Sequence, residues 1–305
     1  MRKIILALIW LTLALPATAT NFTIQIANIT WSGSSGGYQC FNNTAYPNTV
    51  NFTLTKTVSA SHTYAVTAGT SATSGSYSRQ LASGANRLNY QLYTSSAMSY
   101  VLQAPATATA NNVISGNATG GTGQVIPLSF ILFVPTGQGV PPGTYTDTVI
   151  IGVYNTYTGG TLLTSKTITI TVVVPATAVL SIIPTGGSFS SSTSQTLDFG
   201  QLANAQVKSC DLLIKKNTTC TVAFNSANHG VLKMIPTPTA DQIPYSCKVN
   251  GTTLNLSSTA NVNLPTGVSP APDGTRLPVV VTMGDPSGAT AGNYQDQITI
   301  TVTAP

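Results

Sequence analysis

The chain has 305 residues, of which 42% are hydrophobic and only 6% are charged, and its formal net charge is +5. The length suffices for two domains with a core each, but soluble globular domains usually have about a quarter of charged residues. The scattered lysines and arginines form no basic stripe with interleaved aromatics, which argues against nucleic-acid binding. So few charges are more typical of a protein built into an assembly than of a free enzyme.

The N-terminus has the three parts of a secretion signal. Two basic residues open the chain, an apolar run from 4 to 15 follows, and Ala-Thr-Ala at 17–19 offers a cleavage site. The run is too short to span a bilayer comfortably. We therefore expect residues 1–19 to be a signal peptide, and the mature chain to start at Thr20.

The first half of the mature chain predicts a series of short strands. Apolar and polar residues alternate, and many are β-branched or aromatic, which is typical of half-buried strands. No segment has a helical period of useful length. Strands are expected near 22–26, 50–54, 64–67, 88–93, 125–133, 145–154 and 166–174.

The second half repeats this order after a boundary at 175–187. Tyr145 and Asp147 recur as Tyr294 and Asp296, and both offsets are 149 (294 − 145 and 296 − 147). Two copies of one β unit, with short strands and Gly/Pro turns, predict tandem β-sandwiches. The matching strands are expected near 207–214, 220–224, 243–249, 277–283 and 298–303.

The two halves differ at their ends. After the strand at 145–154 the chain turns and adds another alternating strand at 166–174, whereas its counterpart with Ile298, Ile300 and Val302 is followed by no further strand. We expect the second sandwich to lack its last strand, with these three side chains at the edge of a groove that a donor strand completes. About four apolar side chains at about 1.5–3 kcal/mol each would make the second half marginal without its donor.

The sequence gives little support for an enzyme. Gly33-Ser-Ser35-Gly-Gly37 fits G-x-S-x-G, but a nucleophile elbow needs a helix after it and none is predicted. His62 and His229 have no acidic neighbour in sequence. We expect no catalytic residue, no metal ligand set and no cofactor.

Four cysteines lie outside the signal, one in the first half and three in the second. A secreted protein can form disulfides. We expect one bridge inside the second half, with Cys220–Cys247 favoured, whereas the state of Cys40 and of Cys210 stays open.

Several short motifs resemble a known family. They are Arg79-Gln-Leu, Leu88-Asn-Tyr90-Gln-Leu, Gly143-Thr-Tyr145-Thr-Asp147, Leu197-Asp-Phe-Gly200, Ile243-Pro-Tyr245 and Gly292-Asn-Tyr294-Gln-Asp296. Together they resemble the spore coat protein U-like domains of archaic chaperone–usher pili. Two such domains behind one signal peptide are similar to a Csu-type tip adhesin. The single cysteine of the first half departs from the family pattern.

This resemblance implies two Ig-like β-sandwiches: an N-terminal adhesin domain at 20–175 (domain one) and a C-terminal pilin domain at 176–305 (domain two). It implies a tip subunit at the cell surface that mediates attachment to an abiotic or host surface and biofilm formation. A periplasmic pilus chaperone, and later an adjacent pilin subunit, would donate the missing strand, and an outer-membrane usher would assemble the fibre. The alternatives are a mid-fibre pilin or spore-coat-like subunit, and a secreted sandwich that binds glycans.

Strand direction predicts where the attachment surface lies. The closing strand at 166–174 runs toward domain two, so the loop 155–165 lies at the far end of domain one, which we call the distal end. An Ig-like order adds the loops 57–62 and 95–123, and the resemblance implies three hydrophobic finger loops there. Their apolar side chains are Val58, Ala60, Ala97, Met98, Tyr100, Val101, Leu102, Tyr157, Leu162 and Leu163. Exposed apolar patches usually mark interaction sites, although Leu102 and Leu163 could instead plug the end of the sandwich.

Overall fold

The computed structural model describes residues 21–31, 36–42, 44–105, 107–235, 241–269 and 272–305. The predicted signal peptide and residues 33–35 of the G-x-S-x-G match lie outside them. The all-β prediction is confirmed: the one helical segment in the described ranges is the 3-10 turn η1 (Ala110–Asn112). No described helix is long and apolar enough to cross a membrane.

Domain one is built from two sheets that share one core. The first has the order β1-β3-β9-β7, and the second has the order β2-β11-β10-β4-β8, with the hairpin β5–β6 attached to β10. Fully buried side chains from both sheets, such as Leu54, Leu132, Ile151 and Ile170, meet in the core. The bounds are β1 Phe22–Gln25, β2 Ile29–Trp31, β3 Asn48–Lys56, β4 His62–Ala68, β5 Gln80–Ser83, β6 Asn86–Asn89, β7 Gln91–Tyr93, β8 Ile114–Ala118, β9 Val125–Phe133, β10 Gly143–Tyr154 and β11 Leu162–Val174.

Domain two has a separate core between two further sheets. Their orders are β12-β13-β19-β16-β15-β20, with β17 attached to β16, and β18-β14-β21. Leu212, Phe224 and Val249 are buried at its centre. The bounds are β12 Ala178–Pro184, β13 Val207–Lys216, β14 Cys220–Ser226, β15 Val231–Ile235, β16 Gln242–Val249, β17 Thr252–Leu254, β18 Ala260–Leu264, β19 Thr275–Met283, β20 Asn293–Gln295 and β21 Ile298–Thr303.

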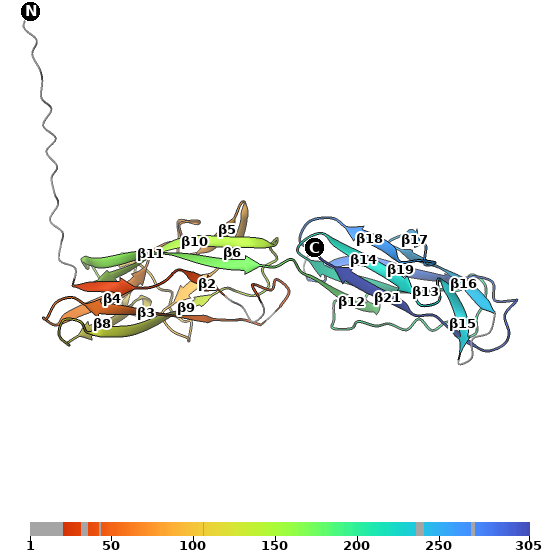
Figure 1. Ribbon diagram of the computed structural model, residues 1–305, viewed down its shortest axis with the longest axis horizontal. Coiled ribbons are helices and arrows are strands. Elements are labelled where there is room, and N and C mark those ends of the chain that lie inside the picture. The colour runs from red at the N-terminus through yellow and green to blue at the C-terminus, as the bar shows by residue number, and fades with distance from the viewer. Residues whose placement is uncertain (1–20, 32–35, 43, 106, 236–240, 270–271) are drawn as a thin grey trace, which may run out of the picture.

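The two domains lie end to end, and the C-terminus lies at the end of domain two that faces domain one (Figure 1). The buried amide of Asn217 connects them. Its Oδ1 accepts the Thr177 N–H at 2.8 Å, its Nδ2 donates to the Pro175 carbonyl at 2.9 Å, and Nδ2 lies 3.5 Å from the Cys40 sulfur. Because one buried side chain satisfies groups on both sides of the linker, it holds the linker against domain two.

The predicted Cys220–Cys247 disulfide is wrong. All four cysteines are described, and all are buried free thiols. The two predicted partners lie in different sheets, Cys220 on β14 and Cys247 on β16. Burial raises the pKa of Cys247 to about 11, and the neighbouring Cys210 adds to this shift. These side chains therefore belong to the core as protonated thiols.

Candidate functional site

β11 covers the edge of β10 over its whole length. The two strands are antiparallel partners from Gly143–Val174 to Tyr154–Leu162. On β10 the side chains of Val149, Ile151 and Val153 are at most 1% exposed. These residues alternate with less buried ones, as expected for a strand with one face in the core.

The matching strand in domain two has no such cover. Ile298, Ile300 and Val302 stand 149 residues after Val149, Ile151 and Val153 (298 − 149, 300 − 151 and 302 − 153), and each is only half-buried.

β21 pairs with β14 through Ser226–Ile298 to Thr221–Thr303, and no described strand pairs with its other edge. An unpaired edge presents free backbone N–H and C=O groups to a further strand. The groove-edge residues predicted from the sequence thus lie along an open sheet edge.

A tyrosine–aspartate pair occurs at the same place in both domains. The Tyr90 hydroxyl donates to Asp147 Oδ2 at 2.6 Å, and the Tyr245 hydroxyl donates to Asp296 Oδ2. Desolvation, together with the hydrogen bond to the carboxylate, raises the pKa of both tyrosines, which keeps them protonated as donors. Each carboxylate also accepts a backbone N–H from a nearby loop, so the pair has a structural role in both domains.

The segment that pairs with β11 in domain one also differs between the domains. In domain one β2 pairs in parallel with β11, with Ile29 opposite Ile170. In domain two Leu197 and Phe199 follow β12 in the corresponding chain order and pack against the core, but their segment is not a strand. A strand needs a partner for its backbone, and the counterpart of β11 that would provide it is absent from the described residues.

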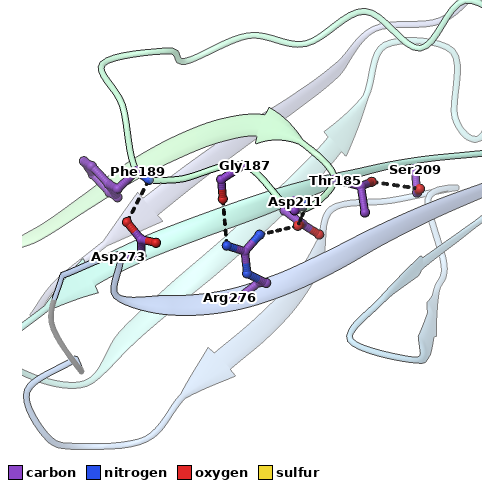
Figure 2. Close-up of polar contacts among 8 residues, drawn as sticks. Thr185, Gly187, Phe189, Ser209, Asp211, Asp273 and Arg276 are labelled. Carbon is purple, nitrogen blue, oxygen red and sulfur yellow. Dashed lines mark hydrogen bonds and ion pairs between the residues drawn. The ribbon is translucent and has the colours of Figure 1, made fainter.

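A charged network holds the turn after β12 in place (Figure 2). Asp211 on β13 forms an ion pair with Arg276 on β19 and accepts the Gly186 N–H at 2.8 Å. Arg276 also donates to the Gly187 carbonyl at 2.7 Å. Asp273 accepts the Phe189 N–H at 3.0 Å. These contacts fix the turn that follows β12. After the turn the chain runs back beside β12, and the Ile182 N–H donates to the Ser192 carbonyl at 2.8 Å.

At the distal end, three short loops meet. They are 57–61 after β3, 119–124 before β9 and 155–161 after β10, and none of them contains a charged residue. Thr63 Oγ1, beside the first loop, donates to the Asn155 carbonyl at 2.6 Å. Figure 1 shows this end of domain one pointing away from domain two.

Four of the predicted attachment residues lie at this end. Ala60 and Leu162 are exposed, the latter by 49%, and Val58 and Tyr157 are half-buried. Val125, which sequence reasoning assigned to a central strand, is 58% exposed at the start of β9 beside the same loops. Its position directly after a glycine-rich loop was the signal that could have identified it.

The hairpin 94–100 lies elsewhere than predicted. β7 ends opposite Ile131, six residues along β9 from Val125 (131 − 125), so this hairpin leaves the side of the sandwich rather than its end. It carries Ala97, Met98 and Tyr100, of which Tyr100 is 46% exposed, and Val101 follows it. The prediction that the whole of 95–123 is distal is wrong, because this hairpin lies at the side.

Met98 has a left-handed backbone, with φ of +50°. This conformation costs a non-glycine residue of the order of 1–3 kcal/mol, and such strain tends to occur at functional sites. Glycine would fit the turn without strain.

Two further predicted attachment residues face the core. Leu102 is fully buried, and its N–H bonds the Leu92 carbonyl at 2.8 Å. It cannot reach a surface, so its assignment to the attachment loops is wrong. Leu163 is partly buried and packs against the same core.

Among the described residues, no group of three histidine, cysteine or aspartate side chains could hold a metal. His62 bonds Asn21 at 3.3 Å. What the described residues offer is an open strand edge and an uncharged end on which Val125 and Leu162 are exposed.

Comparison with known families finds one match: residues 17–152 fit the model of the Spore Coat Protein U domain. The matched segment ends inside β10, so β11 lies beyond it. No curated protein matches the chain.

Solved structures give weaker similarities, among them several fimbrial adhesins. The chaperone–tip adhesion subunit pre-assembly complex CsuC–CsuE of Acinetobacter baumannii Csu pili aligns at 15% identity over 92% of this chain and 99% of that chain, with a TM-score of 0.45. The CupB6 tip adhesin of Pseudomonas aeruginosa aligns at 10% identity over 92% and 94%, with a TM-score of 0.39. Similarities of this size carry no argument about function, which must come from the geometry of the chain.

Proposed function

We propose that this chain, whose residues 17–152 match the model of the Spore Coat Protein U domain, is the tip subunit of a chaperone–usher pilus. Domain one is the adhesin domain, and domain two is the pilin domain that anchors it. In this role the chain passes a periplasmic chaperone and an outer-membrane usher, receives a strand from the adjacent subunit, and attaches cells to abiotic or host surfaces during biofilm formation. No catalytic step is involved.

The observation that carries the proposal is the difference between β10 and β21. The same apolar positions that β11 covers in domain one are half-exposed in domain two. A single added strand would bury Ile298, Ile300 and Val302 and would pair the free edge of β21. Strand addition of this kind gives affinity through main-chain bonds and specificity through alternate side-chain pockets.

The fixed turn after β12 supports the same reading. A strand can add to the free edge of β21 with less ordering if the segments around that edge are already fixed. The network of Asp211 and Arg276 holds the turn that follows β12 (Figure 2). Preorganisation of this kind lowers the entropic cost of binding.

The low charge of domain one supports attachment through its distal end. Domain one has four basic side chains and one acidic one, and only Arg87 and Lys166 among them are exposed. An apolar end with no charge of its own has little hydration to lose on contact with an apolar surface.

A test compares three forms of residues 176–305. The first is unfused, the second carries a C-terminal copy of 162–174 after a flexible linker, and the third carries that copy with Ile168→Ser and Ile170→Ser. We expect only the second to be a soluble, cooperatively unfolding monomer. Equal stability of the unfused form would show that the domain needs no donor strand.

A mid-fibre subunit is the alternative that the structure disfavours. Such a subunit would lend its own first strand to a neighbour, but Phe22 is fully buried and β1 pairs with β3 from Phe22–Lys56 to Gln25–Thr53. We expect limited proteolysis to leave residues 22–31 intact in isolated fibres. Rapid cleavage there, with loss of fibre length, would favour the mid-fibre role.

A further inference from the structure

A buried lysine ends an equivalent strand in each domain. Lys56 is the last residue of β3 and is 1% exposed, and Lys216 is the last residue of β13 and is 4% exposed. Lysine is almost never fully buried unless its ammonium is satisfied. Because a lysine is buried at the equivalent position of both domains, we infer that the two lysines have the same structural role.

Each ammonium bonds carbonyl oxygens of the loop that precedes the central strand. Lys56 Nζ donates to the Ser59 carbonyl at 3.4 Å and to the Gly120 carbonyl, which lies before β9. Lys216 Nζ donates to the Pro265 carbonyl at 2.5 Å and the Gly267 carbonyl at 2.9 Å, both before β19. In each domain the cation therefore fixes a loop that has no regular structure of its own.

In domain one this contact joins two loops of the distal end, 57–61 and 119–124. Backbone bonds beside it complete the connection, from Lys56 N–H to the Gln124 carbonyl at 2.9 Å and from Gly123 N–H to the Lys56 carbonyl at 2.8 Å. No carboxylate takes part, because Asp147, the one acidic residue of domain one, bonds Tyr90. The two distal loops are thus held together by the ammonium group of Lys56, which is buried and not exposed at the surface.

In domain two the equivalent loop, which precedes β19, is covered by domain one. A Cβ atom on Gly139 of domain one would lie 2.9 Å from Cγ1 of Val268, so the loop held by Lys216 packs directly against domain one. Ser269 strengthens that loop through its N–H to the Lys216 carbonyl at 2.7 Å. The loop end that forms an interface in domain two is free in domain one.

We propose that Lys56 is the positioning residue of the attachment surface. Its buried ammonium holds the distal loops in one arrangement, so that Val58, Ala60 and Val125 meet an apolar, uncharged surface together. The inference rests on the proposed function, since it names the residue that shapes the surface used there. Lys216 has the same task at the joint between the domains.

The test uses the full chain with Lys56→Met, with Lys216→Met as the matched control at the equivalent position. Arg79→Met is a second control, because Arg79 is also buried in domain one but bonds Ala68, Gly69 and Leu102, none of them in the distal loops. Hydrogen exchange at Thr57, Gly120 and Gly123 reports loop order, and retention of fibre-bearing cells on polystyrene reports attachment. Gln124→Ala serves if Lys56→Met does not fold, since Gln124 Oε1 accepts the Gly120 N–H at 2.9 Å.

We expect Lys56→Met to raise exchange at the three amides about tenfold or more and to reduce retention severalfold at unchanged fibre yield. Lys216→Met should leave both unchanged, and Arg79→Met should lower global stability without selective loss of distal protection. Unchanged exchange in Lys56→Met, or faster exchange with full retention, would overturn the proposal.

A Met98→Ser, Tyr100→Ser, Leu162→Ser triple variant separates this failure from a failure of the proposed function. If the triple variant loses attachment while Lys56→Met keeps it, the attachment function stands and the role of Lys56 is wrong. If both variants keep full attachment, the distal end and the side hairpin are not the attachment surface at all.

Discussion

Most strands of domain two have a counterpart in domain one, yet among the described residues only domain one contains a strand at the place of β11. Val149, Ile151 and Val153 are buried in one domain, and Ile298, Ile300 and Val302 are half-exposed in the other, although both sets are β-branched residues with alternating polar neighbours. The local pattern is therefore the same, and the difference in burial comes from a single missing partner. Under the proposed function, that partner is a strand of another chain.

The largest expected effect concerns the matched pair Ile151 and Ile300. Ile151→Ala removes a fully buried side chain and should lower the stability of domain one by about 3–4 kcal/mol. Ile300→Ala should cost domain two only about 1–2 kcal/mol, because that side chain is already partly exposed to water. Chemical unfolding of the full chain, with a probe in each domain, measures both.

Fusing the donor copy of 162–174 to the C-terminus makes the comparison of Ile151 with Ile300 sharper. Once Ile300 is covered, its replacement by alanine should cost nearly as much as that of Ile151. A cost that does not change on fusion would mean that the added strand does not lie over β21.

The next effect concerns the two tyrosine–aspartate pairs. Tyr90→Phe leaves the buried Asp147 carboxylate with one donor fewer and should cost about 2 kcal/mol. Tyr245→Phe should cost less, because Asp296 is more exposed and keeps the Ser226 hydroxyl at 2.6 Å. Thermal unfolding of both variants compares them, and equal losses would show that solvent does not reach the pair in domain two.

A smaller effect is expected at alkaline pH. Burial raises the pKa of Cys210 and Cys247 from 9.0 to about 11. The folded state thus holds these protons more tightly than the unfolded state, so their stabilising contribution is present below pH 9 and is lost as the pH rises from 9 to 11. Between pH 9 and 10 the loss should be about 1 kcal/mol per thiol.

The matched variant for the alkaline effect is Cys247→Ala. Between pH 9 and 10 this variant should lose about half as much stability as the unchanged protein loses through Cys210 and Cys247 together. The buried tyrosines have raised pKa values that start from 10.0 and do not contribute below that pH. A domain two whose stability is constant from pH 8 to pH 10 would contradict the assignment of these residues as buried thiols.

The smallest effect concerns Met98. Met98→Gly relieves the left-handed backbone and should raise the stability of domain one by about 0.5–1 kcal/mol, while retention on polystyrene falls slightly. Met98→Leu keeps an apolar side chain and serves as the control. Higher stability with unchanged retention would show that the side hairpin takes no part in attachment.

The sequence was sufficient for the longer strands and for the exposed edge, because both depend on local alternation and on the offset of 149 between the repeats, but it missed the short strands β2, β5 and β8 and placed the domain boundary over β12. It was misleading where the outcome depends on contacts between distant segments. The distal position predicted for the hairpin 94–100 failed because β7 pairs with only the last part of β9. Leu102 is buried through its neighbours in space, which alternation in a loop does not reveal.

The lysines show a signal that was present but unused. Lys56 and Lys216 end equivalent strands at an offset of 160 (216 − 56), and both are buried. Only the structure shows the loop carbonyls that make their burial possible. The disulfide prediction failed for a related reason, since cysteine spacing says nothing about which sheet each cysteine joins.

Hydrogen exchange along β21 tests the central claim most directly. In the full chain without a donor, we expect the amides of 298–303 to exchange far faster than those of 145–154 in β10. Fusion of the 162–174 copy should slow them to the β10 level, whereas the copy with Ile168→Ser and Ile170→Ser should not. Slow exchange along β21 without any donor, or no response to the intact copy, would contradict the account of domain two as a sandwich completed by another chain.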